Sequence, residues 1–154
     1  MEIREAKDTD FDAVFRLKVM LKESERSFTQ GPAIEGAVKD NFEKWLKDDF
    51  VAKDTVVLVA VEEKTPVGMV VAKVYSALPT HNYEKRGYLS NLFVEEKFRR
   101  KGIARELMNS ALDWLKKRGA RSARAEVHLK NASSLNLCHS LGFADYSVKI
   151  FKDL

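Results

Sequence analysis

One stretch of the chain joins a strand pattern, a basic turn and an amphipathic helix. Residues 88–94 are apolar and aromatic, as in a buried strand, and residues 103–115 place their apolar side chains on one half of a helical wheel. The turn between them contains Arg99, Arg100, Lys101 and Gly102. This order most constrains the fold, because it places the free amides of a helix start beside an extended strand.

The two ends of the predicted helix differ. Gly119 follows the last apolar position, where it suits a left-handed C′ residue, and residues 116–118 are basic, which complements the negative end of the helix dipole. At the start, no Ser, Thr, Asp or Asn occupies the N-cap, so the first amides need another acceptor. The basic turn and Gly102 favour a bulky anion such as a pyrophosphate; the alternative is that water satisfies these amides.

The turn and a second motif resemble those of a known family. Residues 99–104 read Arg-Arg-Lys-Gly-Ile-Ala and fit the Arg/Gln-x-x-Gly-x-Gly/Ala signature of the GNAT superfamily of N-acetyltransferases. Asn131 and Gly142-Phe143 stand where the second motif of the family has its Asn and Gly-Phe. The resemblance is close over residues 88–143 and is nearest to the N-terminal acetyltransferases that modify ribosomal proteins. The first 87 residues are similar to the family only in their order of elements.

The chain is expected to be an α/β (α+β) protein with a single domain over residues 1–154. The resemblance implies a mixed, largely antiparallel central sheet, with a splay at the cofactor site and about four flanking helices. The residue patterns predict helices from about 11–21, 37–49, 103–118 and 132–140, and strands over 1–6, 55–61, 67–76, 88–94, 121–129 and 144–152, the second and third strands forming a hairpin.

Few residues remain at the C-terminal end of the predicted sheet. After Phe143 there is room for one ordinary strand or two very short ones, whereas many members of the family have two strands there. An exposed sheet edge at this place would allow a homodimer to form by strand pairing.

Composition excludes several other classes of protein. The formal net charge of +4 favours an anionic partner, but no nucleic-acid-binding motif accompanies it, so nucleic acid is disfavoured. The single cysteine excludes a disulfide framework and a multi-cysteine metal site, and no metal is expected. No apolar run is long enough to span a membrane, and no leader pattern stands at the N-terminus, so a cytoplasmic location is expected.

The resemblance assigns roles toward acetyl-CoA to residues around the turn. The amide of Leu92 would polarise the acetyl carbonyl, and Phe93 and Val94 would pair with the pantetheine arm. Asn131 would hydrogen-bond the cofactor, cap the following helix, or do both. The pyrophosphate would be held by the basic turn and the helix start, namely Arg99, Arg100, Lys101, Gly102, Ile103, Ala104 and Arg105.

Acetyl transfer to an amine needs a proton acceptor, because an amine with a pKa near 10 is protonated at neutral pH. Glu126 is the first candidate, since the ribosomal-protein acetyltransferases have a glutamate five residues before this Asn; the alternative is a strand carboxylate that pairs with a surface charge. Tyr88 stands where histone-type relatives have a catalytic glutamate, but a phenol is a poor base. His128 has a suitable intrinsic pKa but is more simply a structural histidine, and Ser90 with Asn91 could hold a water that relays the proton.

The general acid is where the sequence departs from the family. Cys138 stands in place of the tyrosine of the second motif, and His139 follows it. A thiol could protonate the departing thiolate of coenzyme A, but a small buried apolar role for Cys138 is favoured, with water supplying the proton.

The expected function is therefore acetyl-CoA-dependent N-acetyl transfer to a primary amine, with a protein N-terminus or lysine as acceptor. A polyamine, metabolite or drug amine is the alternative acceptor, and a non-catalytic acyl-CoA sensor is the alternative of another class. The region from Ser24 to Asp49 is expected to border the acceptor site. The polar loop over 77–86, which includes His81, could also touch the substrate, but a solvated connection is the favoured interpretation.

Overall fold

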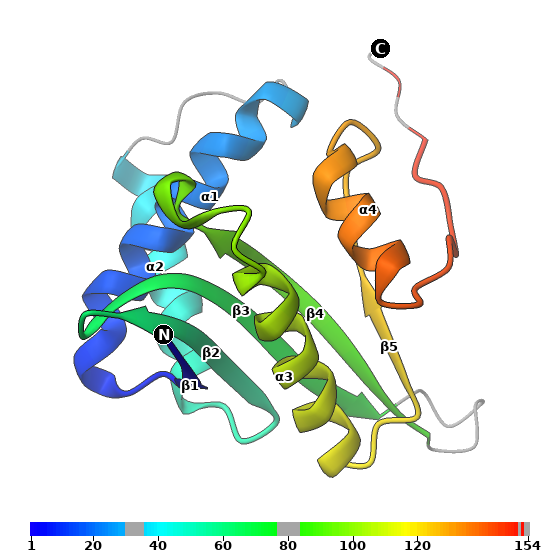
Figure 1. The fold of residues 1–154 in the computed structure, drawn as a ribbon, viewed down its shortest axis with the longest axis horizontal. Helices are drawn as coiled ribbons and strands as arrows, with labels where there is room; N and C mark the ends of the chain where they lie inside the picture. Colours follow the sequence, from blue (N-terminus) through cyan, green and yellow to red (C-terminus); the bar gives the residue numbers. More distant parts are fainter. Residues whose placement is uncertain (30–35, 77–83, 151, 153–154) are drawn as a thin grey trace.

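A five-stranded sheet forms the centre of the fold (Figure 1). The structure is a computed structural model that describes residues 1–29, 36–76, 84–150 and 152. Spatial order follows chain order, and neighbouring strands are antiparallel except for the parallel pair β4–β5. The elements are β1 (Glu2–Glu5), η1 (Asp8–Asp10), α1 (Phe11–Thr29), α2 (Gly36–Val51), β2 (Thr55–Glu62), β3 (Thr65–Ser76), β4 (Lys85–Val94), η3 (Glu96–Phe98), α3 (Ile103–Lys117), β5 (Ser122–Ala125) and α4 (Ala132–Ser140). The predicted mixed, largely antiparallel sheet with helices around it is confirmed.

Helices cover both faces of this sheet (Figure 1). Alternate residues of β2 point to opposite faces, so Val57 and Val59 pack with α1 and α2, whereas Val56 and Leu58 pack with α3. Because both faces are buried, β2 and β3 read as almost continuous apolar runs rather than as an alternation. The sheet is therefore packed on both faces, and the C-terminal end of β4 pairs with β3 at Gly68.

The β2–β3 hairpin turns through Glu63 and Lys64. Both residues have positive φ angles, 47° and 67°, which is the backbone of a two-residue turn that matches the twist of the flanking strands. The predicted hairpin is confirmed, with strand bounds one or two residues longer than expected.

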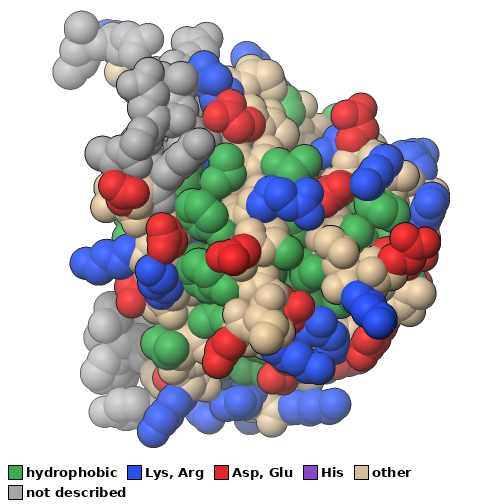
Figure 2. Space-filling view, turned by 90° about the vertical axis from the view of Figure 1, so that its left-hand side faces the viewer, with side chains coloured by type: hydrophobic (Ala, Val, Ile, Leu, Met, Phe, Trp, Pro, Cys, Tyr) green, Lys and Arg blue, Asp and Glu red, His purple; other side chains and the backbone are tan. Residues whose placement is uncertain are grey.

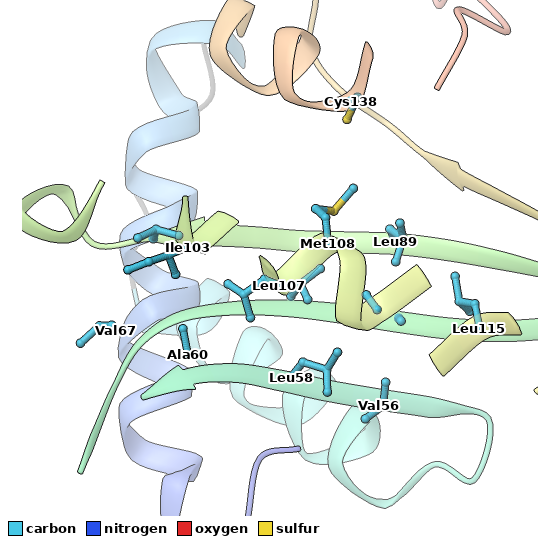
Figure 3. Packing of buried hydrophobic residues seen from close by; sticks show 14 of the residues in the cluster. Val56, Leu58, Ala60, Val67, Leu89, Ile103, Leu107, Met108, Leu115 and Cys138 are labelled. Atoms are coloured by element: carbon cyan, nitrogen blue, oxygen red, sulfur yellow. The ribbon is translucent and has the colours of Figure 1, made fainter. Parts of the chain in front are cut away.

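Helix α3 lies along the sheet and forms most of one core layer. Leu107, Met108, Ala111 and Leu115 are buried on its inner side, as the helical wheel predicts. Figure 3 shows these α3 side chains packed against β2 and β4, with Cys138 of α4 pointing toward Met108 and Leu89. The helix closes as expected at Gly119, whose φ is +83°, and the Ala120 amide donates to the Leu115 carbonyl at 3.0 Å.

The predicted bounds of the strands in the second half of the chain are wrong in three places. β4 begins at Lys85 rather than at Tyr88, and β5 ends at Ala125 rather than at residue 129. Residues 144–150 and 152, predicted as a final strand, form none. The physical reason lies in β4, which leaves β5 after Leu89 and Ala125, so that residues 126–129 have no strand beside them. Residues 144–150 instead contact β5 and the residues after it through side chains, Tyr146 with Arg124 and Lys149 with Glu126.

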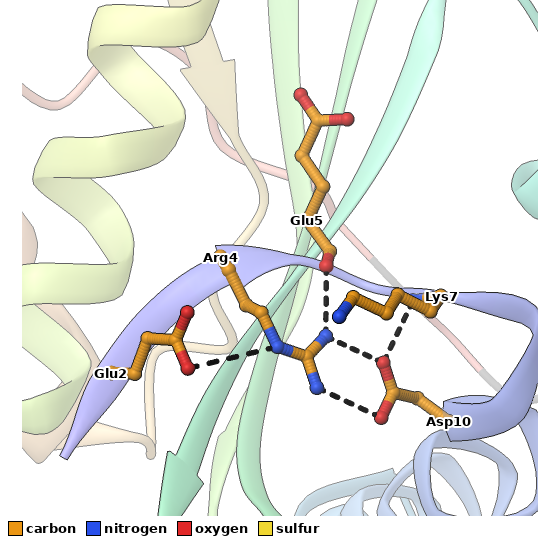
Figure 4. A network of polar contacts seen from close by, with 5 residues as sticks. All are labelled: Glu2, Arg4, Glu5, Lys7 and Asp10. Atoms are coloured by element: carbon orange, nitrogen blue, oxygen red, sulfur yellow. Dashed lines mark hydrogen bonds and ion pairs between the residues drawn. The ribbon is translucent and has the colours of Figure 1, made fainter.

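A polar network fixes the N-terminal strand to the start of α1 (Figure 4). Arg4 donates two hydrogen bonds to the Asp10 carboxylate, at 2.6 and 3.1 Å, and the Lys7 amide donates a third at 2.7 Å. The hydrogen bond from Arg4 is the largest cause that holds the pKa of Asp10 below its ordinary value. Asp8–Asp10 directly precedes a helix, as predicted. These residues form the short 3-10 helix η1 and not a simple cap.

The face of the molecule seen in Figure 2 carries basic and acidic side chains mixed together. No large area of a single sign appears on that face, which is consistent with the small net charge of +4. Among the residues that the structure describes, no helix is long and apolar enough to cross a membrane.

Candidate active site

A cleft of about 400 Å³ opens where β4 and β5 diverge. The ladder between these parallel strands ends at Leu89 and Ala125, and the two segments of the chain separate beyond that point (Figure 1). The cleft wall is made by the C-terminal half of α1, by β4, by the residues after β5 and by α4. The lining residues are Leu21, Lys22, Glu25, Phe28, Tyr88, Leu89, Ser90, Asn91, Leu92, Met108, Ala125, Glu126, Val127, His128, Asn131, Ser134 and Cys138.

A bulge in β4 shapes the floor of this cleft. Met69 of β3 pairs with Phe93 and Val71 pairs with Ser90, so Asn91 and Leu92 together stand opposite one residue of β3. Asn91 has a φ of +53°, a left-handed conformation that asparagine tolerates. On the other side, β5 no longer accompanies this part of β4. The splay that the family resemblance implies is therefore present, and the bulge includes Leu92.

Phe93 and Val94 are buried and belong to the two cores. Phe93 packs with the α1 layer and Val94 with the α3 layer, and neither lines the cleft. Only their backbone can therefore face a ligand. This is compatible with the main-chain pairing that the family resemblance implies, which remains a prediction.

The turn after β4 presents the start of α3 without a cap. Gly102 is the N-cap with φ +83°, no side chain caps the helix, and the first amide with a backbone acceptor is that of Glu106, 3.1 Å from the Gly102 carbonyl. A Cβ added at Gly102 would meet nothing within 4 Å, so the glycine is required by its backbone conformation and not by crowding. Within the described residues, no side-chain cap and no backbone acceptor is found for the amides of residues 103–105, which leaves them available to an anion.

Three basic side chains of the turn and the start of α3 contact other residues of the protein. Arg99 donates from Nε to the Val94 carbonyl at 2.9 Å and lies 5.4 Å from the centre of the Phe93 ring. Lys101 lies 5.5 Å from the Phe98 ring centre, and Arg105 donates to Ser140 Oγ at 2.8 Å. These contacts give Arg99 a role in holding the turn against β4, and they give Arg105 a role in joining α3 to α4.

Glu95 also holds this turn, and the sequence reasoning missed it. Its side chain is buried, and its Oε1 atom lies 2.8 Å from Nη2 of Arg16 on α1. Its amide donates to the Val67 carbonyl at 2.9 Å, and its carbonyl accepts from the Phe98 amide at 2.9 Å. The available signal was an acidic residue directly after a buried strand, but its partner on α1 was not visible from spacing.

Glu126 stands on the cleft wall directly after β5. Its side chain is 58% exposed and forms an ion pair with Lys149. Tyr88 of β4 lies near it, because the negative charge of Glu126 is one cause that raises the pKa of the Tyr88 phenol, after burial, which is the largest. A raised pKa keeps this phenol protonated at neutral pH, which agrees with the sequence interpretation that Tyr88 is a poor base.

His128 stacks on α1 and uses its Nδ1 atom within the chain. Its ring stacks on Phe28 of α1, with ring centres 5.5 Å apart. Its Nδ1 atom accepts the Lys130 amide at 3.1 Å, which places the proton of the neutral ring on Nε2. This arrangement favours the structural role of His128. The contribution of Phe28 was missed, because a single aromatic residue near a helix end gives no distinctive pattern.

Asn131 caps α4 and lines the cleft at the same time. Its Oδ1 atom accepts the Ser134 amide at 3.2 Å and the Ser133 hydroxyl at 3.1 Å. Within the described part of the chain, no hydrogen bond uses its NH₂ group, which remains a donor for a ligand. The cap and a ligand contact are therefore compatible.

Cys138 and His139 differ in their surroundings. Cys138 is 6% exposed, belongs to the α3 core layer and reaches the cleft, and burial raises the pKa of its thiol. His139 Nε2 lies 2.8 Å from Asp145 Oδ1 and is not among the residues of the cleft wall. The buried apolar role expected for Cys138 fits the structure, and His139 is not positioned to replace the missing tyrosine.

The cleft thus combines a bulged strand, an uncapped helix start beside it, an exposed carboxylate and a spare amide donor. Such a set can hold a phosphorylated thioester and accept a proton from an amine. Among the residues that are described, no group of three His, Cys, Asp or Glu side chains is arranged to hold a metal ion.

Two curated relatives share the sequence pattern in part. N-alpha-acetyltransferase 30 of Saccharomyces cerevisiae is 32% identical over 90 residues, which are 55% of this chain and 49% of the relative. The Escherichia coli [ribosomal protein bS18]-alanine N-acetyltransferase is 34% identical over 61 residues, 40% of this chain and 41% of the relative. The matched segments therefore span less than half the length of either relative.

Solved structures share the whole fold. A point variant of a Bacillus halodurans protein superposes with a TM-score of 0.87 at 24% identity and covers 100% of this chain and 99% of its own. The aminoglycoside N-acetyltransferase AAC(6')-Iy, in complex with the bisubstrate analogue CoA-S-monomethyl-acetylneamine, has a TM-score of 0.77 at 19% identity, covering 99% of this chain and 97% of its own. The model of the acetyltransferase (GNAT) family matches residues 18–143. With the bulged strand and the uncapped helix start in place, this match shows that the chain belongs to the acetyltransferase (GNAT) family.

Proposed function

We propose that this chain transfers the acetyl group of acetyl-CoA to a primary amine of a protein, with an N-terminal α-amine as the preferred acceptor and a lysine as the second. The observation that carries the proposal is the bulge at Asn91 and Leu92, which opens one cleft between β4 and β5 beside the uncapped start of α3. The names of the two curated relatives support an α-amine acceptor.

The residues present fit acetyl-CoA. The open amides at the start of α3 suit the pyrophosphate, and the space around Gly102 leaves room for it. When bound, acetyl-CoA supplies a thioester whose carbonyl carbon is open to attack by an amine. The Leu92 amide is the proposed donor to the carbonyl oxygen, and the NH₂ group of Asn131 is a further donor from the opposite wall.

Glu126 is the proposed proton acceptor, directly or through a water. The acceptor ammonium loses one proton to this carboxylate and the neutral amine attacks the carbonyl carbon. The C–N bond forms, the C–S bond breaks, the nitrogen loses its second proton to water, and coenzyme A leaves as a thiolate that takes a proton from water. The ion pair with Lys149 is the surface pairing expected as the alternative role of Glu126, but it also brings a primary ammonium group to this carboxylate. An α-amine has a pKa of about 8, so it gives up its proton more easily than a lysine with a pKa of about 10.

An amine of a small molecule is the second candidate acceptor, and the similarity to AAC(6')-Iy over nearly the whole chain favours it. The test is release of coenzyme A from acetyl-CoA with four acceptors: a peptide with a free N-terminus, the same peptide blocked there but carrying a lysine, a polyamine and an aminoglycoside. The proposal expects the free N-terminus to give the highest kcat/KM. A higher value for the polyamine or the aminoglycoside would overturn the protein acceptor, and no release with any amine would favour a non-catalytic sensor.

A further inference from the structure

The segment after α4 brings a lysine of the chain to the proposed base. Residues 144–150 lie beside β5, and Tyr146 anchors them there: Arg124 donates to its hydroxyl at 3.0 Å and lies 4.4 Å from its ring centre. Three residues further on, Lys149 Nζ lies 2.5 Å from Glu126 Oε2. A primary amine of the protein itself is therefore held at the carboxylate that lines the cleft.

The carboxylate that holds Lys149 shares the cleft wall with Tyr88 and with the bulge residues Asn91 and Leu92. The Lys149 charge also lowers the pKa of the Tyr88 phenol, against the effects of burial and of Glu126. The Lys149 side chain is 78% exposed and has four rotatable bonds, so its Nζ atom can leave Glu126 by side-chain rotation alone.

We propose that Lys149 is a self-acetylation site, modified by acetyl-CoA bound in the same chain. This inference rests on the proposed function, because it uses the same acetyl donor and the same base. The Lys149 ammonium gives a proton to Glu126, and the neutral Nζ attacks the thioester carbonyl carbon. The C–N bond forms, the C–S bond breaks, and the departing thiolate of coenzyme A takes up, through water, the second proton that the nitrogen loses. The product is an uncharged acetyl-lysine, and Glu126 loses its ion-pair partner.

The chain offers a matched control lysine. Lys47 forms an ion pair with Glu43 at 2.6 Å, and its side chain is 62% exposed, but it lies on α2 and away from the cleft wall. Chemical acetylation without catalysis acts on exposed lysines wherever they lie. A preference for Lys149 over Lys47 therefore measures placement at the cleft and not exposure or pairing.

The experiment is peptide mass spectrometry of the full chain incubated with acetyl-CoA and no added acceptor. The proposal expects Lys149 to be acetylated at least tenfold faster than Lys47, at a rate constant that does not change with protein concentration. A Gly102→Asp variant, which should bind acetyl-CoA poorly, is expected to lower the Lys149 rate to that of Lys47. Equal rates at the two lysines in the unsubstituted protein, or a rate constant proportional to protein concentration, would overturn the proposal.

A parallel assay tests self-acetylation of Lys149 and acetylation of a peptide acceptor separately. A peptide with a free N-terminus is assayed with the same preparation, so that its acetylation reports the proposed acceptor independently. Peptide acetylation with an unmodified Lys149 rejects self-acetylation alone, and acetylated Lys149 without peptide acetylation supports self-acetylation while rejecting the peptide acceptor. Lys149→Arg keeps a cation at Glu126 but removes the acceptor amine, so acetyl incorporation into the protein should fall to the background level set by Lys47.

Discussion

Arg16 Nη2 lies 2.8 Å from Glu95 Oε1, and this contact joins α1 to the turn that leads into α3. The Glu95 side chain is only 9% exposed, whereas that of Arg16 is 48% exposed. Lys97 is the other cation near this carboxylate in the described chain, at 3.9 Å. The pair thus connects a helix that lines the cleft to the turn proposed to hold the pyrophosphate.

Arg16→Ala should destabilise the fold by about 1–3 kcal/mol, because it leaves a buried carboxylate without its ion-pair partner. Denaturation in urea measures this loss. Arg26→Ala is the matched control, since Arg26 pairs with Glu23 at 3.1 Å and both side chains are more than 40% exposed. The control should cost less than about 1 kcal/mol. Equal losses in the two variants would show that burial of Glu95 does not strengthen its contact.

Gly102→Asp tests the cofactor turn. A carboxylate at the helix start would repel a pyrophosphate, and the dissociation constant for coenzyme A should rise at least tenfold, about 1.4 kcal/mol. Gly142→Asp is the control, because Gly142 also has a positive φ, +86°, and also has nothing within 4 Å of an added Cβ. Calorimetry should find coenzyme A affinity lowered only in the first variant. A folded Gly102→Asp protein with unchanged affinity would remove the turn from the binding site.

The pair of Arg4 and Asp10 predicts a pH dependence of stability. Because the pKa of Asp10 is lowered in the folded state, its contribution is fully present above the unfolded-state pKa of about 3.9 and is lost as pH falls through the lower folded-state pKa. Asp10→Asn should cost about 1–3 kcal/mol at pH 7 and less near pH 2. Urea denaturation at both pH values measures the difference, with Asp113→Asn, in an exposed pair with Lys116, as a control that should change little at either pH.

Glu126→Gln tests the proposed base. The rate at neutral pH should fall by about 10²-fold or more, with little change in coenzyme A binding, and the loss should shrink as pH approaches the pKa of the acceptor amine. Glu43→Gln, which removes the carboxylate of an exposed lysine pair on α2, is the control. If the two variants give the same pH–rate profile as the unsubstituted enzyme, Glu126 has no part in proton transfer.

Much of this site could be predicted from local patterns, because its parts are local. The strand before Val94, the basic turn and the helix from Ile103 follow one another in sequence, and each has its own periodicity or turn chemistry. Cys138 was interpreted as a buried apolar residue because the thiolate of coenzyme A can leave without a positioned acid. The predictions that failed depend on partners far apart in sequence. The strand predicted over 144–152 has suitable alternation, but a strand needs a neighbour, and β4 leads away from β5 at the bulge.

Contacts between distant segments were missed for the same reason. Arg16 and Glu95, Phe28 and His128, and Lys149 and Glu126 are all separated by more than twenty residues, and no spacing rule relates them. His81 and most of the loop over 77–86 lie outside the described residues, so the predictions for them stay untested. The same holds for residues 30–35 of the region that was expected to border the acceptor.

Cys138 supplies the last prediction, which is that the thiol is dispensable for chemistry. The leaving thiolate of coenzyme A has a pKa of about 8.5, so water can protonate it after the acetyl group departs. Burial raises the pKa of Cys138 and keeps it protonated, but removing an optional donor should cost little. Cys138→Ala should keep the rate within about tenfold and lose about 1 kcal/mol of stability from the small cavity that it leaves beside Met108.

Cys138→Tyr restores the residue that the family resemblance implies. Its ring must extend into the cleft, because the core side of Cys138 is filled, and a strained fit would cost about 1–3 kcal/mol. If the cleft accommodates the ring, a positioned phenol should raise the rate or extend its pH range. Steady-state rates across pH 6–9 for the three proteins, with urea denaturation to establish folding, measure both effects. A folded Cys138→Ala enzyme that binds acetyl-CoA but is slowed by about 10³-fold would instead assign the thiol to the reaction, as acid or as nucleophile.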